Sequence, residues 1–203
     1  MQRTFDKDTI TAAVREVESR TAAEVVVEIH TRSGSYAHAD ARFAALLALL
    51  SLVVLVFMPF VVPPIAVILD PILTWLAGII LARRSAALRR LFSTNAERTA
   101  AVRTHAAAMF HDRGIANTSA ETGLLLYASL LERRIEVLAD RGLLRRLVPH
   151  DWNALLIEIR KERPLDADAI LTAIRSLGAL LARDVPRGAD DVNELADAPE
   201  IGA

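Results

Sequence analysis

The sequence of 203 residues contains no cysteine, and this absence narrows the chemistry open to it. Without cysteine there are no disulfide bonds, no thiolate metal sites and no cysteine nucleophile. The sequence also lacks a phosphate-binding loop pattern and a glycine-rich turn before a helix. Its 24 basic and 25 acidic residues nearly cancel. General nucleic-acid binding depends on a strong excess of positive charge, so we expect no nucleic-acid partner.

Charge is almost absent from residues 43–82, where Asp70 is the single charged residue. One membrane-spanning helix needs about 20 apolar residues, so this stretch has the length of two. Three prolines lie near its middle: Pro59, Pro63 and Pro64. Because proline breaks helices and favours a chain reversal, the sequence predicts a transmembrane helical hairpin. Its helices are expected at about 43–61 and 65–82.

Basic residues flank the apolar stretch on both sides and are absent from its middle. They are Arg32, Arg42, Arg83, Arg84, Arg89 and Arg90. Lys and Arg are in excess on the cytoplasmic side of membrane proteins, so both termini are expected in the cytoplasm. The apolar stretch starts too far along the chain for a signal peptide. We therefore expect a multi-pass membrane protein with two helices in the lipid bilayer.

The single charge within the apolar stretch, Asp70, is costly to place in hydrocarbon. Its position next to Pro71 and close to the predicted turn favours a place in the headgroup region. A role in moving a proton or an ion is the alternative.

The remaining residues, about 160 in number, are enough for one compact domain. Residues 1–40 and 94–185 are expected to form one domain that the hairpin, over 43–82, interrupts. Residues 186–203 are acidic and poor in apolar side chains, so we expect a loosely held tail. The amphipathic stretch from Ser85 to Leu91 is expected to lie at the membrane surface or to continue the second hairpin helix.

Hydrophobic periodicity and capping residues predict helices and strands in a mixed order outside the hairpin. The expected helices are Asp8–Arg20, Thr94–Asp112 with a Thr94/Glu97 capping box and Gly114 after its end, a short turn in Leu143–Val148, a helix from Pro149, and Asp166–Val185. The expected strands are Glu24–His30, Gly123–Leu130 and Arg133–Ala139. Gly123–Leu130 is apolar on both faces, which is typical of a central strand. We therefore expect an α/β fold with a small mixed β-sheet flanked by helices.

Three segments of the chain form a recognisable set: Thr21–Val27 (TAAEVVV), Thr122–Gly142 (TGLLLYASLLERRIEVLADRG) and Asp191–Asp197 (DVNELAD). Together they resemble bacterial membrane proteins that carry the TPM domain, which implies a location in the bacterial inner membrane. The resemblance spans nearly the whole chain, and its second segment is the most specific. It implies a mixed sheet flanked by helices. It also implies functions as diverse as acid phosphatase activity, calcium binding, and the assembly or repair of membrane complexes.

Two carboxylates are candidates for a metal site. Glu24 begins the first predicted strand and Asp140 follows the third, so antiparallel strands would place both at one end of the sheet. Two such oxygen ligands, with loop carbonyls, could bind Ca²⁺ weakly. The alternative is that Glu24 caps a helix or pairs with Arg141 at the surface.

Other acidic and histidine patterns have structural explanations. Asp166-Ala-Asp168 has the form of a paired-aspartate nucleophile, but acidic residues in the first turn of a helix also complement its dipole. His111-Asp112 is expected at a solvated helix end, and His105 does not share a helix face with His111. The tail acids lack the spacing of an EF-hand and are expected either in solvent or docked on the domain: Asp190, Asp191, Glu194 and Asp197.

Two functions remain open from the sequence. The first is a non-enzymatic, membrane-anchored module that binds or helps to assemble another membrane protein. It is favoured because the chain has no recognisable catalytic constellation. The second is a metal-dependent, calcium-binding enzyme that resembles acid phosphatases.

Overall fold

The computed structural model describes all residues except 1–4, 60, 119, 189–194, 196–197 and 203, and only the backbone of Ile201. The described residues form two compact units. One lies within residues 1–33 and 99–203, and the other is formed by residues 34–98. The second unit therefore interrupts the first one in the sequence.

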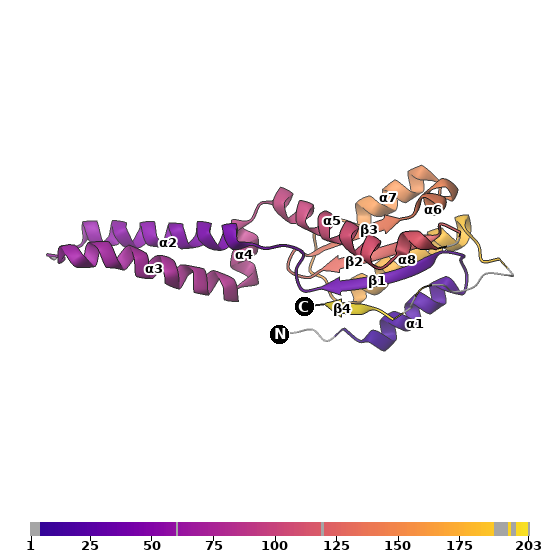
Figure 1. Cartoon of the computed structure of the whole chain (residues 1–203), viewed down its shortest axis with the longest axis horizontal. Coiled ribbons are helices and arrows are strands. Elements are labelled where there is room, and N and C mark those ends of the chain that lie inside the picture. Colours follow the sequence, from indigo (N-terminus) through magenta and orange to yellow (C-terminus); the bar gives the residue numbers. More distant parts are fainter. Residues whose placement is uncertain (1–4, 60, 119, 189–194, 196–197, 203) are drawn as a thin grey trace. The chain divides into compact units, whose positions relative to one another are not determined.

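The first unit is built on a mixed four-stranded sheet in the order β3-β2-β1-β4 (Figure 1). Its strands are β1 (Glu24–His30), β2 (Gly123–Ser129), β3 (Arg134–Ala139) and β4 (Glu200–Gly202). β1 is parallel to β2 and to β4, whereas β3 is antiparallel to β2. The expected mixed α/β fold with a small sheet is confirmed.

The C-terminal strand corrects the expectation of a loosely held tail. Glu200–Gly202 pairs in parallel with Glu28–His30 at the open edge of β1. An edge strand presents unpaired backbone N–H and C=O groups, and even a short segment can satisfy some of them. Three residues are too few to show the periodicity by which a strand is recognised in a sequence.

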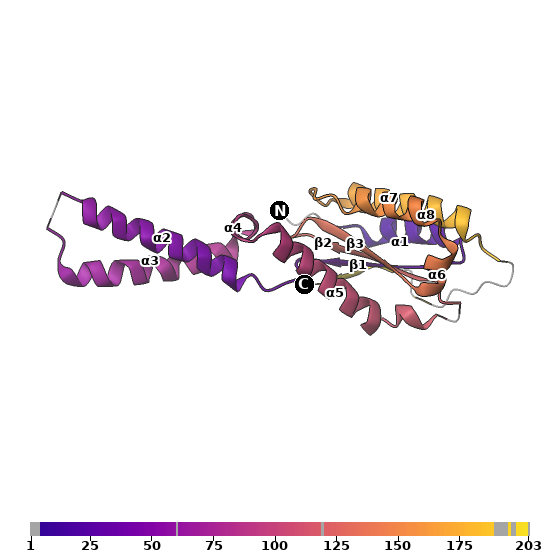
Figure 2. The same cartoon turned by 90° about the horizontal axis from the view of Figure 1, so that it is seen from above.

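Helices cover the sheet on both faces (Figure 2). One face lies against α1 (Lys7–Glu18), α7 (Pro149–Ile159) and α8 (Ala167–Asp184), and the other lies under α5 (Asn95–Asp112). The larger core forms on the first face, where apolar residues of three strands alternate inward: Val25, Val27, Ile29, Leu124, Leu126, Ala128, Ile135 and Val137. A smaller core under α5 contains Val102, Ala106, Ile115, Leu125 and Tyr127. As predicted, β2 is buried along its whole length.

The helix caps predicted at Thr94 and Asp166 are confirmed, whereas the first helix, α1, is capped by Asp6 and not, as expected, by Asp8. The Thr94 hydroxyl accepts from the Glu97 backbone N–H at 3.1 Å, and Glu97 accepts from the Thr94 N–H at 2.7 Å, which is a capping box. Asp166 caps α8 by accepting from the Ala169 N–H at 3.0 Å. Gly114 follows α5 with a φ of 64°, a conformation that glycine adopts without strain. The predicted short turn is α6 (Arg141–Arg146), which begins directly after Asp140.

The second unit contains two long apolar helices, α2 (Ala37–Phe57) and α3 (Pro64–Arg84), followed by α4 (Ala86–Phe92). The chain reverses between Met58 and Pro63, and both of these residues are extended, with ψ values of 138° and 139°. Each precedes a proline, and a proline disfavours helical backbone in the residue before it. The prolines therefore set the reversal, as the sequence predicts.

The start of α2 differs from the prediction, and α4 excludes one of the two alternatives for Ser85–Leu91, the continuation of the second hairpin helix. α2 begins at Ala37 and not near residue 43, because the charged Asp40 is accommodated in the helix by an ion pair with Arg89. Its carboxylate is 3% exposed and accepts two hydrogen bonds of 2.9 Å from Arg89 of α4. α4 does not continue α3, since Ser85 is extended and its hydroxyl caps α4 through the Leu88 N–H.

Small residues allow α2 and α3 to pack closely. A Cβ added at Gly78 would lie 2.8 Å from the Ala44 Cα, a separation that real Cβ atoms essentially never show. Close packing through small residues is the usual way in which apolar helices associate in a lipid environment. The apolar faces turned away from this contact remain exposed.

Close packing of α1 on α8 gives a first testable prediction. A Cβ at Gly178 would overlap the side chain of Val17, so Gly178→Val should destabilise the protein by about 1–3 kcal/mol through overpacking. Thermal unfolding should then begin several degrees lower, at about 2–4 °C per kcal/mol. Adding Val17→Ala should restore part of the loss. Equal stability of Gly178→Val and the wild type would contradict this packing.

Candidate functional site

The face of the sheet that lies under α5 is unusually polar. Side chains alternate between the two faces of a strand. Because Val25, Val27 and Ile29 enter the larger core, the residues between them face α5. In the register of the sheet, Glu28 lies beside Tyr127, and Tyr127 beside Glu136. The polar residues on this face are Glu24, Glu28, His30, Ser129, Arg134, Glu136 and Glu200.

Three rings gather where the parallel strands β1 and β2 end. The His30 ring lies 5.0 Å from His105 of α5 and 5.2 Å from Tyr127 of β2, between ring centroids. His105 lies 5.4 Å from Tyr127. In open α/β sheets, ligands bind beyond the carboxyl ends of the parallel strands. The three rings therefore occupy the part of the fold where binding sites are most often found.

The environment keeps His105 neutral. Burial lowers the pKa of His105, and the neighbouring His30 lowers it further. Its Nδ1 atom is buried and has no hydrogen-bond partner in the described part of the chain. A buried polar atom without a partner costs free energy of folding, so this nitrogen of His105 lowers the stability of the folded chain.

A chain of hydroxyl groups connects Tyr127 to a buried carboxylate. The Tyr127 hydroxyl lies 2.9 Å from the Ser33 Oγ, and Ser33 donates to the Ser129 Oγ at 2.7 Å. Ser129 donates to Glu132, which is 0% exposed, and the Ser33 backbone N–H donates to Glu132 at 2.9 Å. Burial raises the pKa of Tyr127 to about 12, so its hydroxyl stays protonated and can act as a donor.

Arg113 joins two carboxylates on neighbouring strands. Its Nε lies 2.8 Å from Glu28 of β1, and its Nη1 donates to Glu200 of β4 at 2.7 Å. Glu28 also lies 3.1 Å from the Nε2 atom of His30. A pocket of about 230 Å³ lies beside this group and is lined by Val26, Glu28, Arg113, Leu195, Ala198 and Glu200. Arg113 therefore holds β4 against the sheet.

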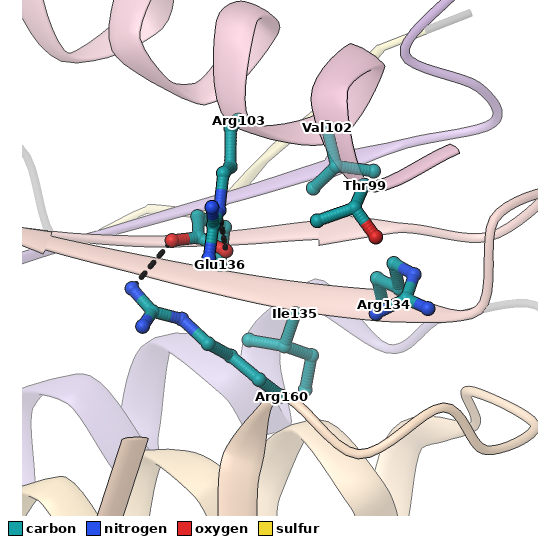
Figure 3. A pocket seen from close by; sticks show the side chains of 7 residues that line it. All are labelled: Thr99, Val102, Arg103, Arg134, Ile135, Glu136 and Arg160. Atoms are coloured by element: carbon teal, nitrogen blue, oxygen red, sulfur yellow. Dashed lines mark hydrogen bonds and ion pairs between the residues drawn. The ribbon is translucent and has the colours of Figure 1, made fainter. Parts of the chain in front are cut away.

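A second, smaller pocket of about 90 Å³ lies at the outer edge of β3. Figure 3 shows Glu136 of β3 between Arg103 of α5 and Arg160, the residue that follows α7. Arg160 donates to Glu136 at 2.5 Å, and the Arg103 Nε lies 4.0 Å from the other carboxylate oxygen. The other residues that line the pocket are Thr99, Val102, Arg134 and Ile135.

The two predicted metal ligands lie at one end of the sheet but make separate contacts. The Glu24 N–H donates to Thr122, and the Asp140 N–H donates to the adjacent Gly123. β2 lies between their strands, so about 10 Å separates the two backbones. Glu24 accepts from the Leu195 N–H at 3.2 Å, whereas Asp140 caps α6 through the Arg141 N–H at 2.6 Å.

The calcium hypothesis stays a prediction. Within the described residues, no group of three or more His, Asp or Glu side chains is placed to hold a metal ion. Asp140 nevertheless has a buried Oδ2 atom without a hydrogen-bond partner in that part of the chain. A carboxylate oxygen of this kind can accept a cation, with loop carbonyls as the further ligands.

The other candidates have ordinary positions. Asp166 is the cap of α8, while His111 and Asp112 are exposed at the end of α5. Asp70 lies within α3, and one of its oxygens is buried without a partner among the residues described. The tail acids Asp190, Asp191, Glu194 and Asp197 lie outside the described residues.

Sequence reasoning missed the two groups that the fold brings together. Glu132 reads as one more charge in the turn between two strands, yet it is fully buried. Arg103 of α5 and Arg160, which follows α7, approach from opposite faces of the sheet and both pair with Glu136. The one signal in the sequence was Glu136 itself, a charged residue within a predicted strand.

The capping and calcium roles of Asp140 can be separated by thermal unfolding in EDTA and in Ca²⁺. Loss of the cap in Asp140→Ala should cost about 1 kcal/mol in either buffer. Asp166→Ala, which removes the cap of α8, is the matched control and should respond in the same way. If Asp140 binds calcium, Ca²⁺ should stabilise the wild type but neither Asp140→Ala nor Glu24→Gln. A wild type that does not respond to Ca²⁺ would contradict the metal site.

The raised pKa of Tyr127 predicts alkaline behaviour. The unfolded chain ionises its tyrosines near pH 10, whereas folded Tyr127 has a pKa of about 12. The contribution of Tyr127 to stability is therefore present below pH 10 and is lost as the pH rises towards 12. In Tyr36→Phe, where Tyr127 is the remaining tyrosine, tyrosinate absorbance should appear only near pH 12 or on unfolding. Ionisation near pH 10 in the folded protein would contradict its burial.

Comparison with known proteins supports the fold alone. No protein-family model matches the chain, and no curated protein matches it. Among solved structures, the NMR structure of the BA42 protein from the psychrophilic bacterium Bizionia argentinensis is similar, with a TM-score of 0.53. The match covers 97% of this chain and 92% of that one at 14% sequence identity. At this identity, the similarity is one of architecture.

Proposed function

We propose that this protein is a membrane-anchored, TPM-like binding module of the bacterial inner membrane, which helps to assemble a membrane complex. The observation that carries the proposal is the exposed apolar surface of α2 and α3 within a chain that otherwise folds as a compact α/β unit. Monomeric soluble proteins rarely expose large continuous apolar surfaces. The hydrocarbon core of a lipid bilayer is an environment in which such a surface is stable.

The dimensions of the two helices support this anchor. α2 and α3 have 21 residues each, which corresponds to about 32 Å at 1.5 Å per residue. The hydrocarbon core of a bilayer is about 30 Å thick. Both helices are long and apolar enough to cross a membrane, and only 11% of the most apolar window of each is buried.

The distribution of charge supports a cytoplasmic location for both termini. Arg42, Arg83 and Arg84 lie near the start of α2 or at the end of α3, and Arg89 and Arg90 follow in α4. The reversal between α2 and α3 has no charged residue. Basic residues are retained on the cytoplasmic side, and this distribution supports a reversal outside the cell and an α/β unit inside it.

A binding role fits the polar groups under α5 better than a hydrolytic one. Ser33 and Ser129 bond to each other and to the buried Glu132, and among the described residues neither is hydrogen-bonded to a histidine. A serine nucleophile is activated by a base such as histidine within hydrogen-bonding distance. The serines therefore act as fixed donors, and the pocket beside Glu136 is open for recognition.

Cysteine labelling tests the anchor, because the native chain has no cysteine to interfere. Val61 is fully exposed in the reversal, and no atom lies within 4 Å of a Cβ added at Gly188. A membrane-impermeant maleimide should label Val61→Cys in intact spheroplasts of bacteria that express the protein. It should label Gly188→Cys only after lysis.

The opposite labelling pattern would reverse the proposed orientation. Recovery of both variants in the soluble fraction, with labelling only after lysis, would contradict the anchor itself. Cysteine-free wild type is the control for background labelling.

A further inference from the structure

Within the described part of the chain, no strand pairs with the outer edge of β3, and the segment after α7 reaches only its beginning, where the Arg163 N–H donates to the Arg133 carbonyl at 3.3 Å. β3 is the terminal strand of the sheet order, and β2 is its neighbour on the other side. Such an edge presents backbone N–H and C=O groups in a row, to which an extended segment of another protein can add. The pocket of Figure 3 lies beside this edge, between α5 and the end of α7.

Positive charge surrounds this edge from both faces of the sheet. Arg103 descends from α5 and Arg160 approaches from below β3 (Figure 3). Arg134 of β3 is the third arginine of the pocket, and it pairs with Glu162 at 3.3 Å. Three arginines therefore stand against two carboxylates, Glu136 and Glu162, and an excess of positive charge remains.

Two of the arginines keep donor capacity. The side chain of Arg103 is 60% exposed, and within the described residues its ion pair is the long, 4.0 Å approach to Glu136. The Nε of Arg160 is buried without a hydrogen-bond acceptor in the described residues. A guanidinium has five N–H donors in a fixed fork that matches a carboxylate. Val102 and Ile135 also line the pocket, one on each face of the sheet. Apolar side chains beside an ion pair reduce the solvent competition that weakens exposed ion pairs.

We propose that the pocket at the edge of β3 binds an acidic, extended peptide segment of a partner protein, with one carboxylate of that segment held between Arg103 and Arg160. Glu136 is the internal carboxylate of the site. It keeps Arg160 in place when the segment is absent, and it opposes the incoming carboxylate by like charge. This inference rests on the proposed binding function and names the chemistry of its partner.

The probe is a fluorescent peptide of alternating valine and glutamate, compared with a peptide in which glutamine replaces every glutamate. Binding is measured by fluorescence anisotropy with the full chain in neutral detergent. The glutamate peptide should bind, and its affinity should fall as salt rises, because ion pairs are screened. The glutamine peptide should bind at least about tenfold more weakly, the ratio that corresponds to the loss of one charge-assisted contact.

Variants separate the pocket from general electrostatic attraction. Arg103→Gln should weaken binding by about tenfold. Arg145→Gln changes the net charge equally at an exposed residue outside the pocket and should leave the affinity unchanged. Glu136→Gln should tighten binding, because the opposing charge is removed. Arg160→Gln is made together with Glu136→Gln, so that no buried carboxylate is left unpaired, and it should abolish this gain.

The proposal is overturned if the glutamate peptide does not bind, if both peptides bind equally, or if Arg103→Gln behaves like Arg145→Gln. Weaker binding by Glu136→Gln would equally overturn the role given to the internal carboxylate. Failure here is distinguishable from failure of the anchor. Cysteine labelling reports on the membrane without the peptide, and peptide binding in detergent is independent of orientation.

Discussion

The parallel pairing of β1 with β2 is the constraint on which the fold depends. The pairing runs in register from Glu24 opposite Gly123 to His30 opposite Ser129. All of unit 34–98 and the whole of α5 lie between these two strands in the sequence. Parallel strands always need a crossover connection, usually a helix. Here α5 is the part of the crossover that covers the sheet. The apolar helices α2 and α3 are an insertion into this crossover, and as an antiparallel pair they begin and end on the same side.

The two faces of the same sheet have different roles because strand side chains alternate. One face is filled by valine, isoleucine and leucine under α1 and α8, and these residues supply the larger core. The face under α5 has a smaller apolar centre and carries charged groups around it. Burying a charged group is costly unless it is paired, and accordingly Glu28 meets Arg113 while Glu136 meets Arg160. The larger share of the apolar stabilisation therefore lies on one face of the sheet, and ion pairs compensate the buried charges on the other.

The sequence was informative where a local pattern determines the structure. The apolar run Gly123–Ser129, the capping residues Thr94 and Asp166, and the prolines of the reversal each act within a few residues of themselves. β4 was not predictable, because a three-residue strand forms only by pairing with the edge of β1 and has no local pattern of its own. The arginine pocket was not predictable either. Arg103 and Arg160 approach Glu136 from opposite faces of the sheet, and no spacing in the sequence encodes that arrangement.

Glu132 shows how a buried charge can fix a segment that has no secondary structure of its own. Glu132 is fully buried, so its carboxylate depends on hydrogen-bond donors within the protein. One donor is the backbone N–H of Ser33, and another is the hydroxyl of Ser129, which itself receives the Ser33 hydroxyl. Ser33 is the last residue of the first unit before the chain enters residues 34–98. The hydrogen bonds to Glu132 therefore hold Ser33, in the segment that follows β1, against the turn between β2 and β3. They fix the position at which the chain leaves the first unit.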